Sequence, residues 1–112
     1  MDEIVLIESP QTAYATRSRN ATLTCRALNA KQIRFKCNGN WLSDSRHNIS
    51  QGIDPTTHRP FYKATVEINH QEINSSAQPN DFTCECYASA DGDAQAVRSE
   101  FAQVRAACEY TN

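Results

Sequence analysis

The chain has 112 residues, 21% of them charged, with a formal net charge of −2 and five cysteines. This length suits one domain, which we expect over residues 1–112, with its core at about 4–105 and a tail or linker at 106–112. The net charge argues against nucleic acid as the main partner, because nucleic-acid binding normally needs a strongly basic face. No apolar run is long enough to span a membrane or to act as a signal peptide.

Short strands separated by turn residues recur along the chain, which is typical of an all-β sandwich. Within the strands at 21–27 and 33–37 inward and outward residues alternate, so one face is predicted to be buried. In the third strand Phe35, the expected core aromatic, and Cys37 point inward, while Arg34 and Lys36 point outward. The pair Asn38-Gly39 supplies the turn that follows. The predicted strands cover residues 4–7, 21–27, 33–37, 62–68, 82–88 and 97–104.

Other segments carry separate predictions. The polar segment 43–60 is expected to hold loops and short edge strands, and Ile73 is expected to close one end of the core after a short turn. Residues 90–93 (Ala-Asp-Gly-Asp) are expected to form a hairpin turn. The alanine-rich segment 94–107 has the propensity of a helix. A helix there would leave the strand at 82–88 without a following partner, so a strand is favoured.

Four cysteines fit an immunoglobulin-like sandwich with two internal disulfides. Cys84 and Cys86 are two positions apart on one strand, so their thiols face the same side. An immunoglobulin domain joins its second and sixth strands by one disulfide, and its neighbouring third and sixth strands lie close enough for another. Cys25 and Cys37 are the candidate partners. The residues alone leave open which of them pairs with Cys84 and which with Cys86.

Other uses of the cysteines are less favoured. A zinc site is possible in principle, but structural zinc sites normally begin with a C-x₂₋₄-C pair, which this chain lacks. Cys108 is left over, and we expect an unpaired thiol there rather than a bridge to another chain or to a residue outside this sequence. The chain also lacks motifs that bring a nucleophile to a base or cradle a phosphate. We therefore expect no catalysis and no cofactor.

The cysteine content and three N-x-[ST] sequons together indicate an extracellular protein. The sequons begin at Asn20, Asn48 and Asn74, and each asparagine is a candidate for N-linked glycosylation. We expect the three asparagines to lie in separate turns or loops.

Two strings carry a resemblance to a known family: Gln32-Ile33-Arg34-Phe35-Lys36-Cys37-Asn38-Gly39-Asn40-Trp41 and Phe82-Thr83-Cys84-Glu85-Cys86. They resemble the first immunoglobulin domain of the uncoordinated-five-type netrin receptors, and the resemblance covers about residues 13–104. The loops depart from the vertebrate pattern, which suggests an invertebrate member. The resemblance implies the disulfides Cys25–Cys86 and Cys37–Cys84.

The resemblance also implies a function. Members of this family are single-pass cell-surface receptors that transduce netrin as a repulsive cue for axons and migrating cells. This chain would be the outermost extracellular module, with the membrane anchor and the signalling parts outside these residues. The alternative is a generic cell-adhesion immunoglobulin domain that binds another cell-surface protein, because fold alone does not separate the two.

Trp41 is the predicted centre of a protein-binding surface, with Asn40 and Ser43 beside it. It follows the Asn38-Gly39 turn, and aromatic anchors dominate the energetics of interfaces. The resemblance implies leucine-rich-repeat cell-surface proteins as partners for this patch. The alternative is that Trp41 folds back over the sheet edge and is only half buried.

A basic patch is predicted from Lys31, Arg34 and Lys36. Such patches bind sulfated glycosaminoglycans through charge, and the resemblance also implies heparan sulfate as a co-ligand. The alternative is a solvated strand face on which Glu85 neutralises Arg34 or Lys36 across the sheet.

Overall fold

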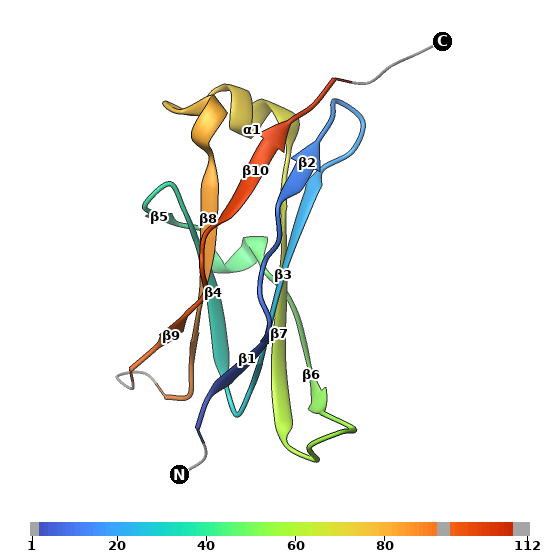
Figure 1. Cartoon of the computed structure of the whole chain (residues 1–112), viewed down its shortest axis with the longest axis vertical. Coiled ribbons are helices and arrows are strands. Elements are labelled where there is room, and N and C mark those ends of the chain that lie inside the picture. The colour runs from blue at the N-terminus through green and yellow to red at the C-terminus, as the bar shows by residue number, and fades with distance from the viewer. Residues whose placement is uncertain (1–2, 92–94, 109–112) are drawn as a thin grey trace.

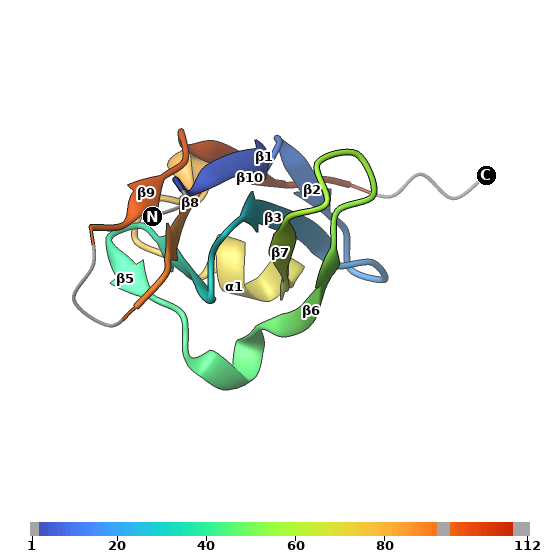
Figure 2. The same cartoon turned by 90° about the horizontal axis from the view of Figure 1, so that it is seen from below.

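The computed structural model describes residues 3–91 and 95–108, which form two β-sheets packed face to face (Figures 1 and 2). One sheet, called here the β3–β7 sheet, has the strand order β1 (Val5–Glu8), β3 (Ala21–Leu28), β7 (Pro60–Ile68) and β6 (Asn48–Ile53). The other, the β4–β8 sheet, has the order β2 (Ala13–Ala15), β10 (Ala102–Ala106), β8 (Thr83–Ser89), β4 (Gln32–Cys37) and β5 (Asn40–Trp41), with β9 (Val97–Arg98) also paired to β8.

The first part of the chain belongs to both sheets. Strand β1 pairs antiparallel with β3, and β2 then pairs parallel with β10 in the opposite sheet. Three short helical elements complete the described fold: the 3₁₀ helix η1 (Asp44–Arg46), the helix α1 (His70–Asn74) and the 3₁₀ helix η2 (Pro79–Asp81). In Figure 1, α1 and the end of β10 lie at the same pole of the sandwich.

The core lies between the sheets and is built from the inward residues that alternation predicts. Phe35 is fully buried, and the buried residues of the neighbouring strands surround it. Figure 2 shows α1 across the far end of the space between the sheets, and this helix contributes the fully buried Ile73. The principal inward residues are Leu23, Cys25, Ala27, Ile33, Phe35, Cys37, Ala64, Val66, Ile68, Cys84, Cys86, Ala88 and Val104.

The two disulfides are Cys25–Cys86 and Cys37–Cys84, as the resemblance implies. Cys37 lies directly opposite Cys84 in the register of β4 and β8, with a Cα–Cα distance of 4.1 Å. Cys86, the next inward residue of β8, lies opposite Phe35 and reaches across the core to Cys25 on β3. The Cys37–Cys84 bond therefore ties two strands of one sheet, and the Cys25–Cys86 bond joins the two sheets. These pairings use all four thiols, so the zinc hypothesis is wrong.

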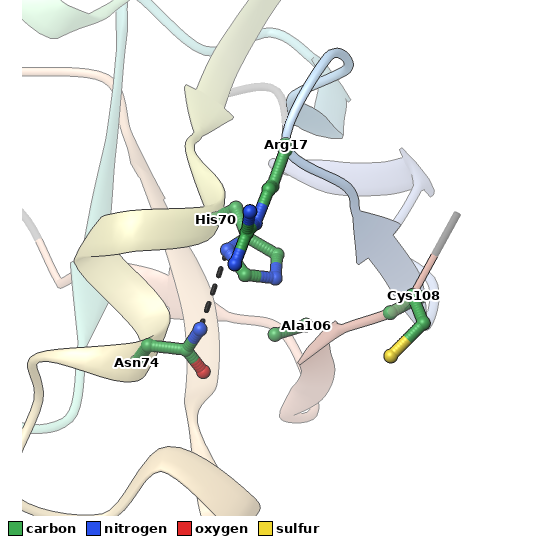
Figure 3. A pocket seen from close by; sticks show the side chains of 6 residues that line it. Arg17, His70, Asn74, Ala106 and Cys108 are labelled. Atoms are coloured by element: carbon green, nitrogen blue, oxygen red, sulfur yellow. Dashed lines mark hydrogen bonds between the residues drawn. The ribbon is translucent and has the colours of Figure 1, made fainter. Parts of the chain in front are cut away.

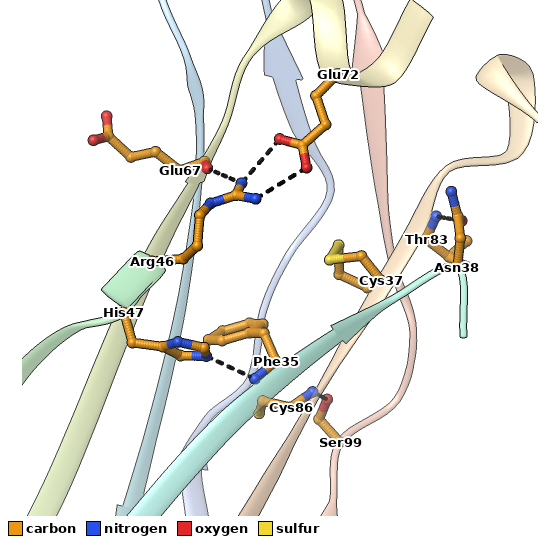
Figure 4. Close-up of a disulfide and its surroundings, with 11 residues drawn as sticks. Phe35, Cys37, Asn38, Arg46, His47, Glu67, Glu72, Thr83, Cys86 and Ser99 are labelled. Atoms are coloured by element: carbon orange, nitrogen blue, oxygen red, sulfur yellow. Dashed lines mark hydrogen bonds and ion pairs between the residues drawn. A yellow bond between two sulfur atoms is a disulfide. The ribbon is translucent and has the colours of Figure 1, made fainter. Parts of the chain in front are cut away.

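The predicted strand at 97–104 is divided in the structure into β9 and β10. The backbone N–H of Cys86 donates to the hydroxyl of Ser99 at 2.9 Å, so a side-chain oxygen takes the place of a carbonyl in the ladder (Figure 4). The pairing of β10 with β8 then resumes at Ala102. The helical alternative for 94–107 is wrong where the structure describes the segment. The predicted turn at 90–93 lies partly outside the described residues.

One expectation for the polar segments is confirmed, and others need correction. The segment 43–60 contains loops, η1 and the edge strand β6, which pairs along its whole length with β7, as expected. Of the three sequon asparagines, only Asn20 lies in a loop; Asn48 begins β6 and Asn74 ends α1. Ile73 does close one end of the core, but it does so from a helix rather than from a simple turn.

Candidate protein-binding surface

A tight hairpin places Trp41 on the outer face of the β4–β8 sheet. Asn38 and Gly39 have φ angles of 51° and 80°, the left-handed conformation that a two-residue hairpin turn requires. Cys37 then pairs with Asn40, and Lys36 pairs with Trp41. Because Cys37 points into the core, Lys36 and Trp41 point to solvent side by side.

Aromatic and cationic side chains meet above strand β4. The ring centroids of Trp41 and Tyr87 are 4.8 Å apart, although the two residues belong to strands on opposite sides of β4. The guanidinium carbon of Arg34 lies 4.7 Å from the centroid of the Trp41 ring system, and Nζ of Lys36 lies 5.0 Å from it. We call these four residues, Arg34, Lys36, Trp41 and Tyr87, the Trp41 cluster.

The contacts in the Trp41 cluster hold the indole in place. A cation over an exposed ring contributes about 0.5–1 kcal/mol, and an aromatic pair contributes a similar amount beyond its burial. The indole nevertheless stays 45% exposed. Trp41 therefore lies across the sheet with one part packed and the other exposed, which is the half-buried arrangement named as the alternative, and its role in binding stays a prediction.

Acidic side chains accompany the cations of this face. Oδ1 of Asp44 lies 3.7 Å from Nε of Arg34, and Oε1 of Glu85 lies 3.6 Å from Nε of Arg98. Glu85 is buried and stands opposite Lys36 in the register, but its ion pair is with Arg98. The expectation that Glu85 neutralises Arg34 or Lys36 is therefore replaced by a pair with a residue of β9. The Arg34–Asp44 pair is exposed, and such pairs contribute at most about 1 kcal/mol.

The loop after β5 is fixed to the edge of β4 by His47. The backbone N–H of Phe35 donates to Nε2 of His47 at 3.0 Å, and Nδ1 of His47 lies 2.9 Å from the carbonyl oxygen of Ser43 (Figure 4). Since Nε2 accepts a hydrogen bond, Nδ1 is the nitrogen that carries the proton and donates to Ser43. This arrangement satisfies a backbone donor at a sheet edge and anchors the chain that leaves Trp41.

The predicted site residues separate into distinct places. Trp41 lies together with Arg34 and Lys36, so the predicted protein-binding and glycosaminoglycan-binding sites share one face. Asn40 lines a different hollow, next to Leu42 and Phe82. Ser43 belongs to the loop at η1, where its hydroxyl contacts that of Ser45. Lys31 lies just before β4, with Nζ 3.8 Å from the carboxylate of Asp91.

Sequence reasoning did not assign Tyr87 and Arg98 to this face. Tyr87 has the outward parity of Glu85 on β8, and that signal was available in the sequence. Its register with Arg34, and the pairing of Arg98 with Tyr87, depend on which strands are neighbours. The hollow in Figure 3 is separate and lies near the end of β10, with Arg17, His70, Asn74 and the free, exposed Cys108 among its lining residues.

These features define the class of protein. Two packed sheets, a disulfide between them and a buried aromatic on β4 make an immunoglobulin domain. Solved structures share this fold. The chain matches Rst D1-D2 with a TM-score of 0.60 and 17% identity, covering 95% of this chain and 49% of that one. It matches the N-terminal Ig1-2 module of the Drosophila receptor protein tyrosine phosphatase DLAR with a TM-score of 0.59 and 19% identity, covering 96% and 50%.

Sequence comparison gives the family. Residues 2–104 match the family model described as the netrin receptor unc-5 N-terminal domain, and the chain belongs to this family. The netrin receptors UNC5D of Rattus norvegicus and Mus musculus are each 32% identical to it over 82 residues. That match covers 73% of this chain but 9% of each relative. The expectation of an invertebrate member stays a prediction.

Within residues 3–91 and 95–108, the helices are too short and too polar to cross a lipid bilayer.

Proposed function

We propose that this chain is an extracellular ligand-binding module of a netrin receptor and that the Trp41 cluster is its contact surface. The observation that carries the proposal is the half-exposed indole, which contacts Arg34, Lys36 and Tyr87. Aromatic residues and arginine are enriched in interface hot spots, where a side chain that is already ordered loses little entropy on binding.

The proposed ligand is netrin, since the matched relatives are named as netrin receptors. The receptor would mediate repulsive axon guidance and cell migration, and it would be anchored in the plasma membrane by residues outside this chain. Leucine-rich-repeat cell-surface proteins are further candidate partners for the same face. The module would act by binding, and its four paired cysteines serve as structural disulfides rather than as nucleophiles.

Alanine substitution of Trp41 tests the contact surface. We expect Trp41→Ala to weaken netrin binding by about 30-fold, the effect of a hot spot worth about 2 kcal/mol. Surface plasmon resonance with the immobilised domain measures it. Tyr14→Ala is the matched control, because Tyr14 is 58% exposed on β2, at the far edge of the same sheet. Equal binding by wild type and Trp41→Ala would contradict the proposal.

Heparan sulfate is the proposed co-ligand of the same face, through Lys31, Arg34 and Lys36. Arg98 adds a fourth cation, while Asp44, Glu85 and Asp91 each lie near one of these charges. We expect retention of the domain on heparin at low salt and a clear loss of retention for Arg34→Glu/Lys36→Glu. Arg17→Glu/Arg19→Glu, which makes the same charge change away from this face, serves as the control. Identical elution of the first double variant and the wild type would exclude β4 as the site.

The alternative function is that of a generic cell-adhesion immunoglobulin domain. The solved neighbours support only the shared fold, because their identity is below 20%. An adhesion domain would self-associate or bind another surface protein without binding netrin. Sedimentation of the isolated domain, combined with the netrin-binding measurement, separates the two functions.

A further inference from the structure

Two of the three sequons lie on one side of the sandwich, on or beside the outer face of the β3–β7 sheet. Asn48 is exposed on β6 and stands opposite Thr65, whose hydroxyl contacts that of Thr24 on this face. Asn20 is exposed immediately before β3, where Thr22, the last residue of its own sequon, pairs with Glu67 of β7. The strands of the β4–β8 sheet carry no sequon.

The two asparagines line adjoining hollows that share Arg46 and Glu67. The hollow at Asn48 is lined by Thr22, Arg46, Asn48, Thr65 and Glu67. The hollow at Asn20 is lined by Asn20, Arg46, Glu67, Asn69, Gln71, Glu72 and Ser75. Both consist of hydroxyl, amide, carboxylate and guanidinium groups, which match the hydroxyl and acetamido groups of a sugar as hydrogen-bond partners.

Arg46 and Glu67, which line both hollows, are called here the common floor. Hydrogen bonds hold the side chain of Arg46 in one position. Its guanidinium donates to both carboxylate oxygens of Glu72, at 2.9 and 3.1 Å, and to the carbonyl oxygen of Glu67 at 2.9 Å. Figure 4 shows this fork and shows the carboxylate of Glu67 directed away from Arg46. The Glu67 side chain is exposed, so its carboxylate can accept hydrogen bonds from a sugar. The Arg46 side chain is itself 34% exposed.

We propose that Asn20 and Asn48 carry N-linked glycans whose first sugars rest on this common floor around Arg46 and Glu67. In the modification, Nδ2 of asparagine bonds to the anomeric carbon of a lipid-diphosphate-linked oligosaccharide. The bond from that carbon to the diphosphate oxygen breaks, the lipid diphosphate leaves, and one amide proton is lost. The inference rests on the extracellular location given under the proposed function. It adds that the β3–β7 face is the shielded side of the module and leaves the Trp41 face uncovered.

Mass mapping of the domain secreted from glycosylating cells tests the modification. We expect glycans on Asn20 and Asn48, loss of the first in Thr22→Ala and loss of the second in Ser50→Ala. Asn48→Gln gives an independent route to the second loss, should Ser50→Ala secrete poorly. Ser76→Ala, which removes the third sequon at the pole near α1, is the matched control and leaves both glycans in place. Unmodified asparagines at 20 and 48 in the secreted protein would overturn the inference, while netrin binding by that protein would leave the proposed function standing.

The rate of enzymatic deglycosylation tests the common floor. We expect an amidase that cleaves N-glycans to release both sugars several-fold more slowly from the native domain than from the unfolded one. Glu67→Ala speeds both releases together, and it keeps the carbonyl oxygen on which Arg46 depends. Lys63→Ala, on the same face of β7 but opposite Ser50, is the control. Unchanged release rates in Glu67→Ala, with both sites occupied, would show that the glycans do not share this floor.

Discussion

At the scale of single residues, neighbouring side chains fix the orientation of Trp41, the proposed contact residue. Lys36 is its direct cross-strand neighbour, and Tyr87 reaches it from the far side of β4. These contacts restrict the rotamers of the indole before any partner arrives, which lowers the entropic cost of binding. An arginine and a lysine on the same ring also give the face a positive rim that suits an acidic partner surface.

Folding lowers the pKa of the Asp54 carboxyl. The backbone N–H and the hydroxyl of Thr57 both donate to Oδ2 of Asp54 at 2.9 Å. These bonds lower the pKa of Asp54 below its ordinary value of 3.8, with a smaller contribution from Arg26. A depressed folded-state pKa means that the stabilisation is complete above the unfolded-state pKa of about 3.9 and is lost as the pH falls through the folded value.

We therefore predict that an NMR titration of the Asp54 carboxyl gives a midpoint below 3.8 and that Thr57→Val, which removes the hydroxyl donor, raises it. Asp54→Asn should lower stability relative to wild type at neutral pH, with a difference that shrinks as the pH falls below about 4. An Asp54 midpoint at or above that of freely exposed aspartates would contradict this account.

At the scale of elements, the β4–β5 hairpin determines where Trp41 lies, and its turn can be recognised in the sequence. Its turn places Asn38 and Gly39 at positive φ, and only glycine adopts such angles without a steric penalty from Cβ. A Cβ on Gly39 would meet no atom within 4 Å, so a substitution there acts through backbone strain rather than through a clash.

We predict that Gly39→Ala lowers the free energy of unfolding by about 1–2 kcal/mol, the cost of a left-handed L-residue. Urea unfolding measures this, and because Trp41 is the single tryptophan, its fluorescence reports the hairpin directly. Gly52→Ala is a useful contrast, since its Cβ would lie 2.8 Å from the ring of Phe61 and its effect would arise from packing. Unchanged stability and emission in Gly39→Ala would show that the turn does not constrain Trp41.

Alternation of apolar residues predicted strands β3, β4, β7 and β8 well, because each has one buried face and a period of two is then enforced by the core. It failed at 97–104, where the hydroxyl of Ser99 replaces a backbone acceptor, a contact that no periodicity signals. The sequence does contain a signal for the start of helix α1, although no helix was predicted there. The side chain of Asn69 accepts a hydrogen bond from the backbone N–H of Glu72, as an N-cap residue does.

The candidate site was only partly predictable for a related reason. The outward direction of Arg34 and Lys36 follows from strand parity, and the hairpin position of Trp41 follows from Asn38-Gly39. The meeting of Trp41 with Tyr87 depends on strand neighbours and on ring orientation, which lie beyond local sequence. Asn40 and Ser43 were chosen by proximity in sequence, and the structure places Asn40 in a different hollow.

At the scale of the whole molecule, two disulfides close loops with sequence separations of 61 and 47 residues. In the chain-entropy model, each stabilises the folded state by about 4 kcal/mol. The Cys37–Cys84 bond links β4 to β8, and the Cys25–Cys86 bond links the two sheets. The disulfides therefore constrain β4 and β8 on their inner face, opposite the Trp41 cluster. The module then has two different sides, a polar face with sequon asparagines at Asn20 and Asn48, and a face of aromatic and cationic side chains.

Hydrogen–deuterium exchange of the secreted, disulfide-bonded domain with and without netrin tests the central claim most directly. The account predicts that netrin slows exchange in β4, β5 and β8, at residues 32–41 and 83–89, and leaves β6 and β7 unchanged. Slowed exchange at residues 48–53 and 60–68, with none around Trp41, would place the contact on the opposite sheet and contradict the account.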